Sequence, residues 1–130
     1  MEDPPTASAT AGEAISEAIG RLWEEAKQPQ SQSFLALYFE LAALSVCEPA
    51  TYRPLVRTLD DDWVHAMSGQ LTSRGVPPQQ VEAVISTALA GYRGALLLAL
   101  ATDDWKAADE AITCIIEALK QQIHEGAEPS

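Results

Sequence analysis

The stretch that decides the fold is ALAGYRGALLLALA, residues 88–101, which is apolar almost throughout and carries two glycines three residues apart. With the residues that precede it, from Val84 onward, it is about long enough to span a bilayer. Arg93 stands near its middle, where a charge in lipid is costly, and the flanking residues VEAV and TDDW are acidic without a basic anchor. We therefore expect a buried helix over about 78–101, without membrane contact.

The two glycines of this helix need a physical reason, because each costs roughly 1 kcal/mol relative to alanine in a helix interior. The usual reason is close approach, since a residue without Cβ lets another backbone come near. Helical spacing puts small residues on one strip and bulkier residues on another. The small strip is Ala88, Gly91, Gly94 and Ala95, and the bulky strip is Ile85, Leu89, Tyr92, Leu96 and Ala99. Such a helix is expected to pack on two sides, one internal and one against another subunit.

Helical periodicity extends over the rest of the chain of 130 residues, of which 47% are hydrophobic, and no strand or hairpin signal interrupts it. The sequence predicts an all-α bundle of about five helices in one domain over residues 11–125, with flexible tails at 1–10 and 126–130. The expected helices cover about residues 12–27, 32–47, 51–73, 78–101 and 103–123.

Prolines, glycine and capping residues define the ends of these helices. Pro29 ends the first helix, and Ser31 or Ser33 is expected to cap the second. Gly75 is expected to end the third, and Thr102 or Asp103 to cap the fifth. The second helix, 32–47, is apolar nearly all round, with Glu40 as its only charge, which predicts a central position in the domain.

The formal net charge of −11 argues against direct binding of nucleic acid or anionic lipid by this chain. No secretory signal opens the sequence. The two cysteines, Cys47 and Cys114, lie far apart in apolar surroundings, outside any metal-binding spacing. We expect two buried free thiols in a reducing cytoplasm rather than a disulfide.

Residues 34–123 resemble the C-terminal domain of TetR-family transcriptional regulators. The resemblance rests on FLALYFELAALSVCEPATYRPLV, on a long helix ending in SRGVPP, on TALAGYRGALLLALATDDW and on a last amphipathic helix. It implies a homodimer in which the last two helices of each copy form a four-helix bundle. It also implies a mostly apolar pocket for a small effector, formed by the earlier helices. The expected dimer residues are Ala88, Gly91, Gly94, Ala95, Ile112, Ile116 and Leu119.

The N-terminal helix-turn-helix of such regulators has no counterpart before Gly12, so the sequence suits either part of a longer regulator or a protein without the DNA-binding head. By position on inward-facing stripes, the candidate ligand-binding residues are Phe34, Tyr38, Trp63, Met67 and Tyr92, with Arg93 or His65 as polar partner. Ordinary core packing is the alternative interpretation of each of these residues. For Arg93, a further alternative is an ion pair with an acidic residue across the bundle.

No motif for catalysis, a cofactor or a metal is present in the sequence. Asp60, Asp61 and Asp62 follow one another on a helix, where successive side chains point about 100° apart and cannot converge on one ion. We therefore expect no enzyme. Three hypotheses remain: an effector-binding and dimerisation domain, a protein-interaction module without effector, and a stand-alone protein that sequesters a small apolar molecule.

Overall fold

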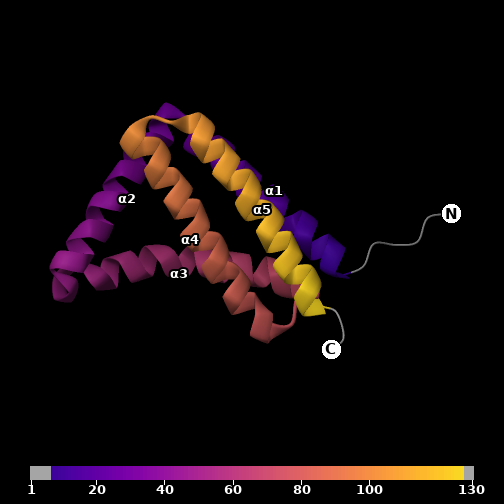
Figure 1. The fold of residues 1–130 in the computed structure, drawn as a ribbon. Coiled ribbons are helices and arrows are strands. Elements are labelled where there is room, and N and C mark those ends of the chain that lie inside the picture. The colour runs from indigo at the N-terminus through magenta and orange to yellow at the C-terminus, as the bar shows by residue number, and fades with distance from the viewer. Residues whose placement is uncertain (1–6, 128–130) are drawn as a thin grey trace.

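The computed structural model describes residues 7–127, with side-chain detail for residues 11–124, and no strand occurs in this part of the chain. The all-α prediction with five helices is confirmed (Figure 1). The helices are α1 (Ala7–Ala26), α2 (Pro29–Cys47), α3 (Pro49–Ser73), α4 (Pro78–Thr102) and α5 (Trp105–Ala127).

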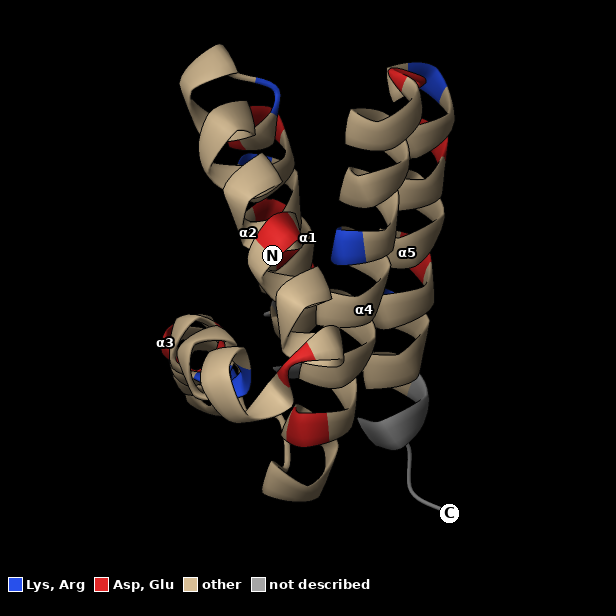
Figure 2. Ribbon diagram, turned by 90° about the vertical axis from the view of Figure 1, so that its left-hand side faces the viewer, with Lys and Arg blue, Asp and Glu red and all other residues tan. Residues whose placement is uncertain are grey.

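The helices form two regions. α1 and α5 lie side by side with α4 next to them, whereas α2 and α3 project to one side and outline a triangle with α4 (Figure 1). Seen from that side, α4 and α5 stand together opposite α1 and α2, and α3 is viewed nearly end-on (Figure 2). We call residues 29–62, which comprise α2 and the first part of α3, the arm.

The turn from α3 to α4 follows from the sequence SRGVPP. Gly75 adopts a left-handed conformation with φ 88°. The amide of Val76 donates to the carbonyl of Leu71 at 3.1 Å, and the amide of Gly75 donates to that of Thr72 at 3.0 Å. This is a Schellman motif, which satisfies the last carbonyls of a helix, and the buried side chain of Val76 supplies its hydrophobic contact. The predicted end of this helix at Gly75 is confirmed.

Three other helix ends differ from the prediction. α2 begins at Pro29 after an extended Gln28, so Ser31 and Ser33 lie inside the helix and cap nothing. α3 begins at Pro49, only one residue after α2 ends, which leaves Pro54 inside the helix. The cap of α5 is Asp104, whose carboxylate accepts the amide of Ala107 at 3.0 Å, because Asp103 takes the left-handed conformation that ends α4.

The expected tails also differ from the structure. Residues 7–10 lie in the first turns of α1, where Ala7 and Ala9 have high helix propensity. α5 likewise continues to Ala127. The remaining parts of both predicted tails, 1–6 and 128–130, lie outside the described residues.

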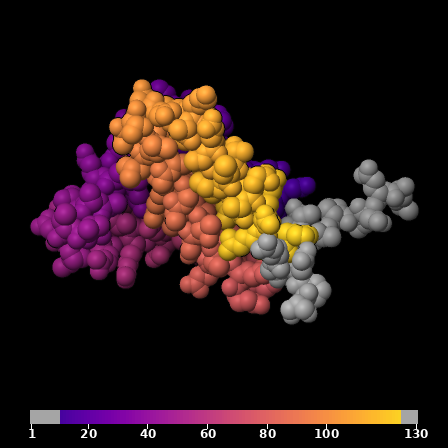
Figure 3. Space-filling model, in the orientation of Figure 1, coloured from indigo at the N-terminus to yellow at the C-terminus, as the bar shows by residue number. Residues whose placement is uncertain are grey.

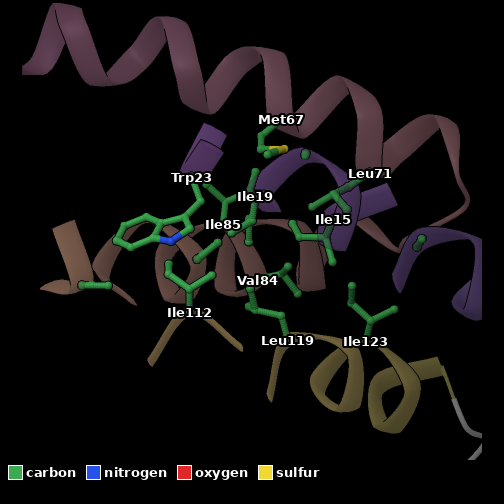
Figure 4. Packing of buried hydrophobic residues seen from close by; sticks show 14 of the residues in the cluster. Ile15, Ile19, Trp23, Met67, Leu71, Val84, Ile85, Ile112, Leu119 and Ile123 are labelled. Carbon is green, nitrogen blue, oxygen red and sulfur yellow. The ribbon is translucent and has the colours of Figure 1, made fainter. Parts of the chain in front are cut away.

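The core lies where α1, α4 and α5 meet the second half of α3. Side chains from these four helices converge there (Figure 4). The largest fully buried ones are Ile15, Ile19, Leu71, Val84, Leu96, Leu119 and Ile123.

The arm contributes no buried apolar side chain among its described residues, and its single buried residue is Ser45. The predicted central position of the second helix is therefore wrong, since α2 packs mainly on α3 and exposes Phe34 by 61% and Leu37 by 52%. The arm forms a separate projection beside the helices of the core (Figure 3).

Candidate functional site

The predicted ligand-binding residues do not line one common pocket. Trp63 and Met67 line a cavity between α1 and α3. Tyr38 and Arg93 form a polar cluster with Asp60, whereas Tyr92 packs into the junction of α4 with α1. Phe34 is exposed to solvent at the surface of the arm.

The cavity between α1 and α3 has a volume of about 280 Å³ and is open to solvent on one side. Its inner wall is apolar and includes Met67, which is buried, and Trp63, which is partly buried. Three polar side chains stand at its rim: Arg21 and Glu25 of α1 and Gln70 of α3. An apolar wall with a few polar groups is the usual composition of a small-molecule site. The lining residues are Ala18, Arg21, Leu22, Glu25, Trp63, Ala66, Met67 and Gln70.

The polar cluster joins the arm to α4. The hydroxyl of Tyr38 donates to Oδ1 of Asp60 at 2.8 Å, and Arg93 binds the same carboxylate oxygen. The guanidinium carbon of Arg93 also lies 5.0 Å from the centre of the Tyr38 ring, a cation–π geometry. Arg93 thus has an acidic partner across the bundle, as one of its predicted roles required, and it does not line the α1–α3 cavity.

Burial and the bond to Asp60 raise the pKa of Tyr38 to about 12, although the positive charge of Arg93 opposes that rise. The phenol is therefore neutral at ordinary pH and acts as a donor. Asp61 and Asp62 are exposed, and no group of three metal-ligating side chains occurs within the described part of the chain.

Tyr92 connects α4 to α1 through both its hydroxyl and its ring. Its hydroxyl donates to the backbone carbonyl of Leu22 at 3.0 Å, and its ring meets that of Trp23 edge to face at 5.9 Å. Burial raises the pKa of Tyr92 to about 12, and the charge of Glu25 adds to the rise. Tyr92 is therefore a structural contact at the back of the cavity wall rather than an exposed ligand contact.

A second polar contact closes the seam between α1 and α5. The indole Nε1 of Trp23 donates to Oδ1 of Asp109 at 2.7 Å, and Lys27 lies 3.1 Å from the same oxygen. The Trp23 bond is the largest cause of a lowered pKa of Asp109, and Lys27 contributes as well. The sequence reasoning missed this pair, because no local spacing connects residues 86 positions apart.

Most of the predicted dimer residues are buried within the chain itself. Ala88, Ala95, Ile112 and Leu119 belong to the core and present no surface to a second copy. A Cβ at Gly91 would lie 3.0 Å from side-chain atoms of Ile115, so the close approach that this glycine allows is with α5 of the same chain. Ile116 is partly buried and packs against the core. The four buried residues are therefore corrected to internal packing contacts, whereas a dimer contact of Gly91 or Ile116 stays a prediction.

Gly94 differs from the other predicted dimer residues because it faces open space, with no atom within 4 Å of a Cβ placed there. It belongs to an exposed face of α4 that carries no charge between Ala83 and Thr102, although the chain as a whole is strongly acidic. Most of the α4 ribbon is tan in Figure 2, the colour of residues that are neither acidic nor basic. We call this the α4 face; its residues are Ala83, Ser86, Thr87, Ala90, Gly94, Leu97, Leu98 and Ala101.

Among the described residues, α4 is the one helix long and apolar enough to cross a bilayer. Within its most apolar window 33% is buried inside the fold, and Arg93 is held there by Asp60 of α3. The core helix of a soluble protein has the same length and composition, so this is weak evidence for a span. The expected absence of membrane contact stays a prediction.

Both cysteines are free thiols, as predicted, but the predicted burial is wrong, since Cys47 and Cys114 are exposed. Cys47 ends the exposed arm helix, and Cys114 lies on the outer side of α5. His65 is exposed on α3 and does not line the α1–α3 cavity.

Comparison with known proteins adds no assignment: no family model, no curated protein and no solved structure matches the chain.

Proposed function

We propose that this chain is a homodimeric effector-binding domain of the kind found in TetR-like transcriptional regulators, and that it responds to a small, largely apolar molecule. The observation that carries the proposal is the uncharged α4 face. Exposed helix faces in an acidic protein are ordinarily charged, as α1 is at Glu13, Glu17 and Glu24. An exposed apolar face bounded by polar residues is typical of a protein–protein interface.

The dimer proposed here differs from the one expected from the sequence. It is formed by the outer side of α4, where Leu97 is 49% and Leu98 is 38% exposed. Gly94 lies in the same face with open space above it, so a helix of a second copy can approach closely there. The buried residues Ala88, Ala95, Ile112 and Leu119 support this face from inside, where α4 packs against α5.

The effector site in this proposal is the cavity between α1 and α3. Its apolar wall suits a small apolar molecule, and Trp63 and Met67 are the predicted ligand residues that line it. The wall is directly connected to α4, since the Tyr92 hydroxyl binds the carbonyl of Leu22, another lining residue. A ligand that displaced α1 would therefore act on the helix that carries the α4 face.

Sedimentation of matched glycine variants tests the dimer. Gly94→Leu is expected to produce monomers, because the leucine blocks close approach of a second helix. Gly69→Leu is the matched control, since Gly69 is also exposed, lies on α3, and has no atom within 4 Å of its Cβ position. A wild-type protein that sediments as a monomer contradicts the proposal, as does a Gly94→Leu variant that stays dimeric.

A second candidate is a protein-interaction module without effector, which the exposed apolar side chains of the arm favour. Phe34, Leu37, Leu44 and Val46 all lie on α2 and are 38% exposed or more. Native mass spectrometry of the purified protein separates the two candidates. A dimer that carries a small-molecule adduct supports the effector domain. A bare dimer supports the interaction module if filling the cavity by Ala66→Leu changes no binding property of the protein.

A further inference from the structure

The α1–α3 cavity is formed by two helix faces with the same residue spacing. Each helix contributes positions i, i+3, i+4 and i+7, which lie on one face of an α-helix. The small side chains Ala18 and Ala66 leave room between the two backbones at the cavity. The two faces are Ala18, Arg21, Leu22 and Glu25 on α1, and Trp63, Ala66, Met67 and Gln70 on α3.

Two opposite charges stand one helical turn apart on the α1 side of this cavity. Neither the guanidinium of Arg21 nor the carboxylate of Glu25 makes an ion pair or a hydrogen bond with any residue that the structure describes. An arginine four residues before a glutamate is also the weaker orientation for a pair within a helix. Both groups are thus available to a molecule in the cavity. Arg93, by contrast, is already bound by Asp60.

The charge of a suitable ligand follows from this pair. A simple anion that pairs with Arg21 is repelled by Glu25 and by a chain of net charge −11. A simple cation that pairs with Glu25 is repelled by Arg21. A molecule with one negative and one positive group complements both side chains and carries no net charge, so the field of the acidic chain does not oppose its entry.

We propose that the α1–α3 cavity binds a small zwitterion with an apolar or aromatic body, such as an amino acid with a large apolar side chain. Its carboxylate lies at Arg21, its ammonium group at Glu25, and its body against Leu22, Trp63 and Met67. The partly buried indole of Trp63 offers a flat surface for an aromatic body. This inference rests on the proposed function, because it takes this cavity to be the effector site.

Isothermal titration with four probes that share one ring tests the charge requirement: tryptophan, 3-indolepropionate, tryptamine and indole. Tryptophan is expected to bind roughly fivefold more tightly than either singly charged probe, because a solvent-exposed charge pair contributes up to about that factor. Arg21→Gln is expected to reduce tryptophan affinity to that of tryptamine in the wild type. Glu25→Gln is expected to reduce it to that of 3-indolepropionate.

Two variants outside the cavity serve as matched controls. Glu13→Gln removes an exposed acid from the same helix, and Arg57→Gln removes an exposed arginine from the facing helix. Neither is expected to change the affinity for tryptophan beyond the small effect of net charge. Equal losses in the controls and in the cavity variants would show that net charge alone governs binding, which overturns the proposal.

Other results also overturn the proposal, and they separate it from the proposed function. If tryptophan binds no more tightly than indole, the cavity is not a zwitterion site. If Ala66→Leu also abolishes the binding of indole, the cavity is still an effector site, but for uncharged apolar molecules. A wild-type protein that binds none of the four probes rejects the zwitterion. The proposed dimer is judged independently by sedimentation of Gly94→Leu.

Discussion

The core and the arm of this chain are both helical and both rich in apolar residues, but only the core buries them. Every buried apolar side chain of the described residues lies on α1, α4, α5, the second half of α3 or the turn after α3. The arm holds only Ser45 as a buried residue. Hydrophobic composition alone therefore does not place a helix inside a domain. A helix must also have neighbours on several sides, and α2 packs mainly on one, α3.

The largest expected contrast between the two regions comes from matched leucine truncations. Leu96→Ala removes a side chain that is 2% exposed in the core, and is expected to cost about 3 kcal/mol of unfolding free energy through lost burial and a cavity. Leu37→Ala, at a side chain 52% exposed on the arm, is expected to cost less than about 1 kcal/mol. Urea unfolding measures both. Equal costs would mean that the arm is packed as tightly as the core.

The second contrast is between two partly buried phenols with similarly raised pKa values. Burial holds the pKa of both Tyr92, in the core, and Tyr38, in the arm, at about 12. A folded pKa above the unfolded value of 10.0 means that the stability contributed by each neutral phenol is present below pH 10 and lost as pH rises toward 12. We therefore expect alkaline pH to lower global stability through Tyr92 and local stability of the arm through Tyr38.

The two tyrosines are expected to act on different parts of the molecule. Tyr92→Phe removes the bond to the Leu22 carbonyl, at a cost of about 1 kcal/mol, and reduces the alkaline loss of global stability by roughly 2 kcal/mol. Tyr38→Phe leaves global unfolding nearly unchanged and reduces the alkaline increase in amide exchange of α2, because its hydroxyl bonds only within the arm, to Asp60. Urea titrations and hydrogen exchange at about pH 9 and 11.5 separate these outcomes. An alkaline transition that is identical in both variants and the wild type contradicts the role given to the phenols.

The sequence predicted local structure well where one short signal determines it. The proline and glycine of SRGVPP determine the α3–α4 turn, and the chain is all-α as its periodicity requires. Predictions that depended on the arrangement of the helices were less successful. The apolar α2 was expected to be central, and Cys47 and Cys114 to be buried, because an apolar neighbourhood along the chain does not reveal which side of a helix other helices cover.

The candidate site shows the same division. Trp63 and Met67 are predicted as ligand residues from their spacing on an inward side of α3, and both line the candidate cavity. Arg21 and Glu25 were not found, since they lie on the polar side of α1, and nothing in their local sequence shows that α3 passes opposite them. Contacts between residues far apart in sequence depend on the crossing of two helices, which the periodicity of either helix alone does not contain.

The smallest expected effects come from two glycines, and they test the close contact between α4 and α5 at Gly91. Gly69→Ala, at an exposed position with open space around the new Cβ, is expected to raise the unfolding free energy by roughly 1 kcal/mol through helix propensity alone. Gly91→Ala has the same propensity gain, but its Cβ would lie 3.0 Å from Cγ1, Cγ2 and Cδ1 of Ile115. Because three atoms of one β-branched side chain crowd that position, a change of rotamer cannot easily relieve the contact, and α4 and α5 must separate slightly.

We therefore expect Gly91→Ala to gain no stability, or to lose some, in the same urea titration. The double variant Gly91→Ala, Ile115→Val is expected to recover part of the missing propensity gain, since valine lacks the Cδ1 atom of the contact. A full gain of about 1 kcal/mol from Gly91→Ala alone would show that Ile115 yields freely. Gly91 would then serve no close approach within the chain, and its place in the small-residue strip of α4 would need another explanation, such as a helix of a second copy that reaches beyond Gly94 toward the seam.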